Sequence, residues 1–292
     1  MRSPRSRVLV VACLLTLGMA AGAPGVAAAS WVSPPATKAG ASPKGTPWTL
    51  AGQSCRLIPT SSTPAALDGS EACGGIRPGS PVLTPVGQCT LNFLWKGSDG
   101  RHYIGTAGHC VLEGTNQTQA VYPPGQGPVA RDASGHPIGE FAYGALDEVG
   151  DFALIRLDPA VPASPEICRF GGPSGMAVGP IPLLTPLHHV GRGSLTGSLV
   201  PARTQLAIDG GDVRVLTGLG VASAGDSGSP VVGLDGQAVG VVVATGPALP
   251  LAPTGLLVFS MRIAPEMGRA AAAMGIAFDL VTAPVAGGVL QP

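Results

Sequence analysis

The stretch with the clearest potential for chemistry is the hexapeptide 225–230, which reads Gly-Asp-Ser-Gly-Ser-Pro. Glycine on both sides of the Asp226-Ser227 pair allows a tight turn and close approach of another molecule. In such a turn the backbone N–H groups of Gly225 and Ser227 can converge. They would hold the oxyanion that forms when a serine attacks a carbonyl. A plain turn between two strands is the simpler interpretation of the hexapeptide by itself.

Two stretches upstream supply the groups that a nucleophilic serine needs. His109 lies in the segment Thr-Ala-Gly-His-Cys at 106–110, and Asp151 opens the apolar segment 151–157. A serine hydroxyl is a poor nucleophile until a base removes its proton. A histidine can take that proton and return it to a leaving amine, and an aspartate can fix the histidine tautomer. The three stretches together indicate a catalytic triad.

The three motifs, in the order His, Asp, Ser, resemble those of the chymotrypsin-like (trypsin-like) serine protease family. The separations are 151 − 109 = 42 and 227 − 151 = 76 residues, and the resemblance covers roughly residues 76–278. It implies an all-β fold of two packed six-stranded antiparallel β-barrels with a C-terminal helix. It also implies a triad of His109, Asp151 and Ser227, with an oxyanion hole at Gly225 and Ser227. The implied activity is endopeptidase hydrolysis of protein or peptide substrates through an acyl-enzyme, with no cofactor and no metal.

Motif order argues against other serine hydrolases. An α/β-hydrolase has its histidine after the serine, whereas all five histidines here precede Ser227. A subtilisin-like enzyme needs its aspartate before its histidine, and Asp68 and Asp99 lie in no supporting motif. The pair His188-His189 could suggest a metal, but adjacent residues of a strand point to opposite faces.

The resemblance also implies structural pairings. Cys89 and Cys110 match the family disulfide beside the catalytic histidine, and Cys168 is expected to pair with Cys73 or Cys55, of which Cys73 lies nearer the core in sequence. A buried Asp226 needs a cationic partner, because an unpaired buried charge is costly. The segment 191–197 resembles a stretch of the bacterial branch, the streptogrisins and α-lytic protease, where an arginine pairs with the matching aspartate. This predicts Arg192 as the partner.

The family pattern predicts an apolar primary specificity pocket. The residue six before the serine lies at the pocket base, and here it is Val221. Gly255 is expected on a third side. No carboxylate occupies any of these positions, so a substrate with Arg or Lys before the scissile bond is disfavoured. The two walls are predicted to consist of Ala222, Ser223, Ala224, Val243, Ala244 and Thr245.

Two positions depart from the family pattern. Ser229 stands where the serine motif usually has glycine. Val243 stands where the family usually has a serine that supports the triad aspartate, which would reduce activity. A catalytically weak or inactive homologue that serves as a binding module is therefore one alternative. An acyl hydrolase acting on esters is a second.

Composition and segment patterns complete the predictions. Arg2, Arg5 and Arg7 precede an apolar run, so residues 1–29 are interpreted as a signal peptide of a secreted protein. Residues 30–75 are rich in Pro, Ser and Gly and are predicted to form an arm or pro-segment. Residues 76–278 are predicted to form the protease domain, and residues 279–292 a flexible tail. Lys+Arg and Asp+Glu both number 17, so no excess of charge points to binding of nucleic acid or of a membrane surface. The protein is expected to be a monomer. The 44 glycines and 30 prolines favour short strands, expected at 89–95, 101–107, 138–143, 152–157, 181–184, 213–219, 231–233, 238–244 and 256–263, with one helix at 265–274.

Overall fold

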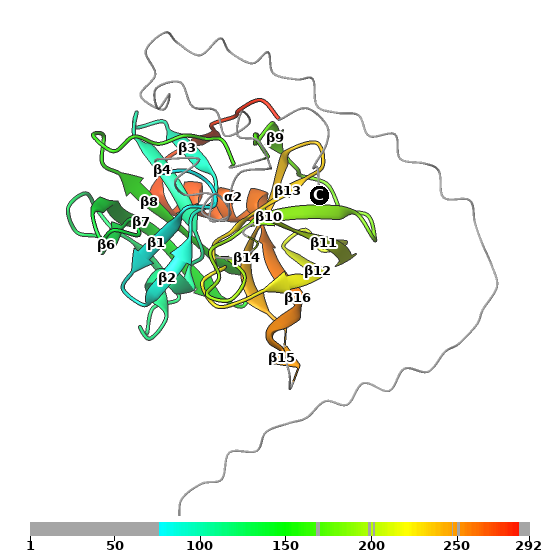
Figure 1. The fold of residues 1–292 in the computed structure, drawn as a ribbon. Helices are drawn as coiled ribbons and strands as arrows, with labels where there is room; N and C mark the ends of the chain where they lie inside the picture. Colours follow the sequence, from blue (N-terminus) through cyan, green and yellow to red (C-terminus); the bar gives the residue numbers. More distant parts are fainter. Residues whose placement is uncertain are drawn as a thin grey trace, which may run out of the picture. The chain divides into compact units, whose positions relative to one another are not determined.

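The computed structural model describes residues 76–285 except 168–169, 198–199, 201, 247 and 250–251. The predicted signal peptide, the predicted arm and the cysteines Cys55, Cys73 and Cys168 lie outside these residues. Strands dominate the described chain, as Figure 1 shows. The helices are α1 (His109–Leu112) and α2 (Ile263–Met274). The strands are β1 (Pro81–Thr84), β2 (Gly87–Thr90), β3 (Leu94–Gly97), β4 (His102–Thr106), β5 (Gln119–Val121), β6 (Val129–Arg131), β7 (Pro137–Asp147), β8 (Gly150–Leu157), β9 (Gly175–Met176), β10 (Pro186–Val190), β11 (Ala202–Asp209), β12 (Val215–Ala222), β13 (Pro230–Gly233), β14 (Gln237–Thr245), β15 (Ala248–Leu249), β16 (Ala252–Arg262) and β17 (Phe278–Leu280).

The C-terminal half of the sheet structure forms a closed barrel. Strand β10 pairs with β11 and β13, β12 pairs with β11 and β16, and β14 pairs with β13 and β16. These antiparallel pairings close six strands into a ring, which leaves the ring without an unpaired edge. Its strands run from green to orange on the right of Figure 1.

The N-terminal strands form the first barrel around a bent segment. Neighbouring strands of this sheet follow the spatial order β3, β4, β8, β7, β6, β1 and β2. Segment 87–97 contains both β2 and β3. At its bend, Asn92 donates its N–H to the Gly105 carbonyl at 2.7 Å, and Gly105 donates to the Phe93 carbonyl at 3.1 Å. These bonds carry the pairing from β1 across to β4, so the prediction of a two-barrel all-β fold with a C-terminal helix is confirmed.

The first barrel has an apolar interior. Alternate side chains of β1, β3, β4, β7 and β8 point into the barrel, and their exposed fraction is at or near zero, as expected for half-buried strands. Helix α1 adds its buried residues to the same cluster. This core fixes the two strand ends from which His109 and Asp151 emerge. Its large members include Leu91, Leu94, Ile104, Leu112, Phe141 and Ile155.

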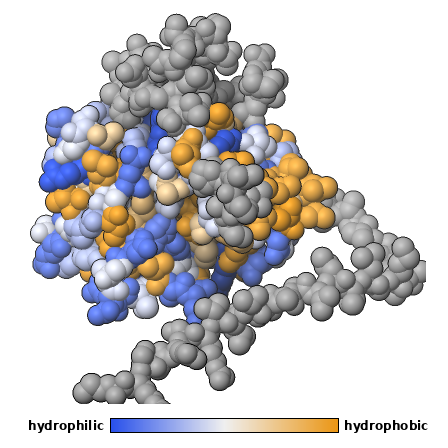
Figure 2. All heavy atoms as spheres, turned by 60° about the horizontal axis from the view of Figure 1, so that its bottom comes forward, coloured by the Kyte–Doolittle hydropathy of each residue, from blue (hydrophilic) through white to orange (hydrophobic). Residues whose placement is uncertain are grey.

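The second barrel has a more polar interior and an apolar outer surface. Strand β11 turns Arg203, Gln205 and Ala207 inward, while Leu206 and Ile208 are 37% and 38% exposed. On β12, Val215 and Leu219 are likewise more than one-third exposed. Figure 2 shows apolar residues concentrated toward the right of the view. No helix of the described residues is long and apolar enough to cross a membrane.

Several expected elements are shifted or missed. The strand expected at 181–184 is wrong: Pro182–Thr185 forms a turn with Leu184 at a φ of 61°, and β10 begins at Pro186. Strand β11 (202–209) was not expected. The start of the predicted flexible tail is also wrong, because β17 pairs Asp279 and Leu280 with β3, and Val285 bridges to Gly171. Helix α2 begins two residues before the predicted Pro265.

Candidate active site

His109 stands at the start of α1, directly after β4. Gly108 is needed there, because a side chain at this position would collide with the carbonyl oxygen of Ala145 on β7. This close approach brings the histidine backbone against the strand that precedes Asp151. Cys110 follows, and its disulfide to Cys89 on β2 has a Cα–Cα distance of 6.4 Å. The predicted pairing of these two cysteines is confirmed.

Asp151, the second residue of β8, holds His109 through both carboxylate oxygens. The His109 backbone N–H donates to Oδ1 at 2.9 Å, and ring Nδ1 lies 2.8 Å from Oδ2. A carboxylate accepts only, so Nδ1 carries the proton and Nε2 is left as the basic nitrogen. The side chains are 19% and 15% exposed. Burial by itself lowers the pKa of His109, but the hydrogen bond and charge of Asp151, with the charge of Glu113, outweigh it and raise that pKa.

Ser227 lies in the turn between β12 and β13. Gly225 and Gly228 adopt φ values of 96° and 92°, a region that favours glycine. A side chain on Gly228 would collide with the Thr90 carbonyl and the Thr106 hydroxyl, so the turn packs directly on the segment that leads to His109. Gly228 also donates its N–H to the Val242 carbonyl at 2.7 Å, which fixes the turn to β14.

Thr90 joins the serine turn to the first barrel, and sequence patterns did not single it out. Its N–H donates to the Ser227 carbonyl at 2.8 Å, and its hydroxyl donates to the Gly225 carbonyl at 2.8 Å. Its own carbonyl accepts from the Thr106 hydroxyl at 2.9 Å. Thr90 is fully buried and follows Cys89. The disulfide and these hydrogen bonds therefore connect the serine turn to the histidine segment.

The two N–H groups predicted for the oxyanion hole point to no other acceptor. Among the hydrogen bonds of the described residues, neither the N–H of Gly225 nor that of Ser227 is a donor. Over the same residues the Ser227 hydroxyl makes no hydrogen bond to His109. Catalytic hydrogen bonds are often long without substrate and tighten in the substrate complex.

Asp226 is fully buried and its carboxylate is saturated with donors. Oδ1 accepts from the Arg203 guanidinium at 2.5 Å and from the Gly193 N–H at 2.7 Å. Oδ2 accepts from the Ser223 N–H at 2.8 Å and the Thr196 hydroxyl at 2.9 Å. The cation comes from β11, so the charge pair and the turn are both part of the second barrel.

The prediction that Arg192 neutralises Asp226 is therefore wrong. Arg192 uses its backbone N–H to bond the Thr90 hydroxyl at 3.0 Å, and its Nε donates to the Gly79 carbonyl at 3.2 Å. The family-like segment 191–197 does contribute to the aspartate, but through Gly193 and Thr196. Arg203 lies 203 − 192 = 11 residues later, on a strand that the sequence did not predict.

Arg203 also contacts His189. Its Nε donates to His189 Nε2 at 2.9 Å, while His188 turns its Nδ1 to the Thr204 hydroxyl at 2.9 Å and stacks on Phe170. The two adjacent rings thus face different partners, as expected for neighbouring strand residues. Burial, with the charge of Arg203, lowers the pKa of His189 to about 3. His189 is consequently neutral and accepts the arginine N–H.

The predicted pocket residues lie on three neighbouring strands. Ala222 pairs with Gly255 across β12 and β16. A side chain on Gly255 would collide with the Gly246 carbonyl and come within 2.9 Å of the Thr245 Cβ. The two walls and the third side are therefore adjacent. Val221 and Val243 are half-buried, Ala224, Ala244 and Thr245 are exposed, and Ala222 and Ser223 are buried.

Val243 gives Asp151 no hydrogen bond. Its side chain packs instead against the apolar cluster of the first barrel, although its strand β14 belongs to the second barrel. Both hydrogen bonds to the Asp151 carboxylate within the described residues come from His109. The other departure, Ser229, is fully buried and donates its hydroxyl to the Asp226 carbonyl at 2.6 Å.

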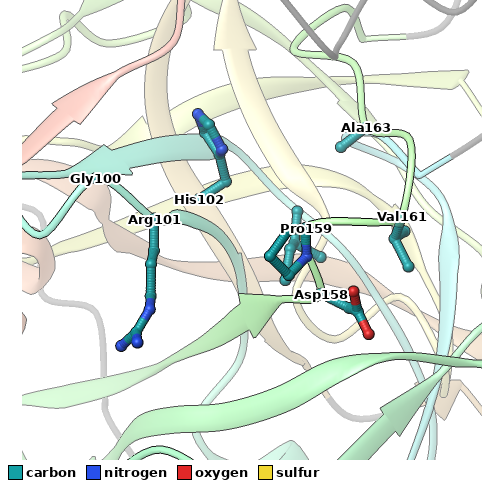
Figure 3. Close-up of a pocket in the computed structure, with 8 residues that line it drawn as sticks. Gly100, Arg101, His102, Asp158, Pro159, Val161 and Ala163 are labelled. Carbon is teal, nitrogen blue, oxygen red and sulfur yellow. The ribbon is translucent and has the colours of Figure 1, made fainter.

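A pocket elsewhere in the first barrel is remote from these groups. It is lined by Arg101, His102, Leu157 and Asp158 among others. These lie at the far ends of β4 and β8 from His109 and Asp151, and six residues of β8 span about 20 Å. Figure 3 shows the side chains of Arg101 and His102 pointing to opposite sides. The labelled polar side chains of Arg101, His102 and Asp158 do not converge in Figure 3, so the candidate site remains at the junction of the barrels.

Comparison with known proteins gives structural similarity only. No family model and no curated protein sequence matches the chain. Thermobifida fusca Protease A is similar at 16% identity over 71% of this chain and 100% of its own, with a TM-score of 0.48. A glutamic acid specific serine protease is similar at 15% identity over 69% and 98%, with a TM-score of 0.48. Cellulomonas bogoriensis chymotrypsin is similar at 16% identity over 70% and 99%, with a TM-score of 0.45.

Proposed function

We propose that the protein is a serine endopeptidase that cleaves peptide bonds through His109, Asp151 and Ser227. The observation that carries the proposal is the bidentate Asp151–His109 contact, at 2.9 and 2.8 Å, beside a glycine-flanked serine turn. That turn is held against the histidine segment by Thr90 and by the Cys89–Cys110 disulfide.

Each residue has a distinct role in this reaction. His109 Nε2 removes the proton of the Ser227 hydroxyl as its oxygen attacks the substrate carbonyl. The oxyanion is held by the N–H groups of Gly225 and Ser227. His109 then protonates the leaving amine, and water hydrolyses the acyl-enzyme by the reverse sequence of proton transfers. Arg203 takes the place proposed for Arg192 in neutralising Asp226, without a contribution from a new N-terminus.

A catalytically weak or inactive homologue is the second candidate. One observation favours it: Val243 gives Asp151 no hydroxyl and packs on the apolar cluster of the first barrel instead. Esterase activity is a further outcome, since the same nucleophile cleaves activated esters. We propose in addition that the protein is secreted through residues 1–29, acts as a monomer, and accepts apolar residues before the scissile bond.

Labelling with a fluorophosphonate followed by mass spectrometry of the full chain separates these candidates. We expect the label on Ser227, and Ser227→Ala should reduce peptide hydrolysis on the order of 10⁶-fold. Ser194→Ala is the matched control, because Ser194 is exposed and close in sequence to the Asp226 network. A chain that takes no label and hydrolyses neither proteins nor peptides would be the binding module. Label together with hydrolysis of esters alone would indicate an esterase.

The pH dependence provides a second test. Because Asp151 and Glu113 raise the pKa of His109 above its ordinary value of 6.5, kcat/KM should fall as the pH drops through a midpoint above 6.5. Below that midpoint His109 is protonated and cannot act as the base. An acid limb with a midpoint near 4 would assign the base to a carboxylate instead.

A further inference from the structure

Glu266 is a buried acid beside the candidate triad with no role in the reaction above. It lies in the first turn of α2 and is 1% exposed. A Cβ atom placed on Gly150 would come within 2.8 Å of Glu266 Oε1. Gly150 is the residue before Asp151, so the Glu266 carboxyl lies against the backbone that carries the triad aspartate.

Glycine at position 150 is what allows this approach. A side chain there would also collide with the guanidinium of Arg269, one helical turn after Glu266. Gly150 pairs with Asp147 at the tight end of the β7–β8 hairpin. The absence of a Cβ atom lets Glu266 and Arg269 of α2 lie directly against this hairpin.

The cation beside Glu266 is held mainly by another acid. Arg269 Nη2 lies 2.7 Å from Asp147 Oδ2 and Nη1 lies 3.3 Å from Oδ1, whereas Nη1 is 3.9 Å from Glu266 Oε2. Within the described residues Glu266 Oε2 has no hydrogen-bond partner. A fully buried carboxylate without such partners is costly, which favours the neutral acid.

The groups that face Glu266 come from several elements. Tyr143 and Asp147 lie on β7, Asp151 on β8, Arg269 on α2 and Arg214 before β12. Burial raises the pKa of Glu266 most strongly, Arg269 and Arg214 lower it, and Asp151 and Asp147 raise it, with a net value of about 7. Glu266 therefore changes its charge in the neutral range, close to the range in which His109 titrates.

We propose that Glu266 is a positioning residue of the triad, whose ionisation beside Asp151 strengthens His109 as a base. The inference rests on the proposed function. Asp151 accepts both of its described hydrogen bonds from His109, so no other donor within the described residues compensates a change of charge next to Asp151. A second anion favours the imidazolium form of His109, and the two groups titrate as a coupled pair.

The coupling is measurable without catalysis. The His109 ring can be titrated by NMR in the full chain and in Glu266→Gln, which keeps the shape and removes the charge. We expect the variant to lower the His109 midpoint by about half a unit to one unit. The acid limb of kcat/KM should shift in the same direction by the same amount, which a purely structural role of Glu266 would not produce.

Glu113→Gln is the matched control. Glu113 is exposed and also raises the pKa of His109, but its effect should disappear in about 1 M salt because exposed charges are screened. The effect of the buried Glu266 should persist. An unchanged His109 midpoint in Glu266→Gln would overturn the proposal.

A measurement on the unmodified chain covers the case in which Glu266→Gln does not fold. The Glu266 carboxyl carbon should titrate with a midpoint near 7 by ¹³C NMR. An ordinary midpoint near 4.5 would also overturn the proposal. Failure of the proposed function remains distinguishable, because it appears as absent fluorophosphonate labelling whether or not His109 and Glu266 are coupled.

Discussion

The two barrels hold their candidate catalytic residues by opposite means. In the first barrel an apolar core fixes the strand ends that carry His109 and Asp151, and a disulfide at Cys89 and Cys110 is the added constraint. In the second barrel the serine turn is fixed by a buried ion network around Asp226, and the barrel interior also contains Gln205 and Ser260.

This difference has an energetic consequence. The loss of one apolar contact costs a free energy of unfolding that grows with the buried surface removed. The loss of a disulfide costs one that grows with the length of the closed loop. A buried ion pair does not follow such a proportion, because removing one partner leaves an unpaired charge. The Gln205 amide and the Ser260 hydroxyl have no hydrogen-bond partner among the described residues, but neither do Asn92 Nδ2 and Trp95 Nε1 of the first barrel. The difference between the barrels therefore lies in the buried ion pair of Asp226. The serine turn is therefore expected to be in the more fragile barrel.

Among the changes that compare the two barrels, the largest effect on turnover is expected at Asp151, where turnover and stability should separate. Asp151→Asn keeps the shape of the side chain but favours the wrong histidine tautomer, so kcat should fall on the order of 10⁴-fold. Thermal unfolding should change little, because the apolar core of the first barrel is untouched. Steady-state kinetics and calorimetry of the same sample test the separation. A large loss of stability would show that the first barrel also depends on a buried charge.

Arg203→Met should give the opposite result, with stability and activity lost together. The substitution leaves the Asp226 carboxylate buried without its cation, which costs about 3–5 kcal/mol. Urea unfolding of this variant should be compared with that of Arg192→Met, which leaves the Asp226 pair intact. Equal losses in the two variants, or a larger loss in Arg192→Met, would return the role to Arg192.

The ion network also shows where prediction from sequence succeeded and failed. The three short motifs predicted the Asp151–His109 contact, because each motif combines a reactive residue with its local backbone requirement, and the family resemblance that they carry implied the Cys89–Cys110 disulfide. Strand β11 was missed because its inward positions are Arg203 and Gln205, which reverse the usual apolar-inside alternation. Residues such as Thr90 and Glu266 act through neighbours that are remote in sequence, and no local pattern marks such contacts.

Replacing both Cys89 and Cys110 by alanine should cost about 3 kcal/mol, because the bond closes a loop of 21 residues. The first barrel retains its apolar core, so the variant should still fold and unfold in one transition. Its activity should fall less than that of Arg203→Met, since Thr90 still holds the serine turn. Complete unfolding at room temperature would show that the disulfide, rather than the core, maintains the first barrel.

The smallest effect is expected in the choice of substrate, which depends on the second barrel alone. The turn contains a carboxylate, but Asp226 is fully buried and already bound by Arg203, Gly193, Ser223 and Thr196. It therefore cannot serve as the counter-charge for a substrate cation. The predicted pocket base at Val221, the wall at Val243 and the third side at Gly255 add no charge. A substrate Arg or Lys would lose hydration without compensation.

Matched peptides that differ only at the residue before the scissile bond test this pocket. We expect Leu and Phe to exceed Arg and Lys in kcat/KM by about 10- to 100-fold, the range that apolar pocket contacts usually provide. Val221→Asp supplies the missing charge at the proposed base and should improve cleavage after Lys relative to Leu, with Val178→Asp, an exposed position, as the control. Preference for Arg or Lys in the unmodified chain would overturn the assignment of Val221 to the pocket base. A response to Val178→Asp equal to that of Val221→Asp would attribute the gain to net charge rather than to the pocket.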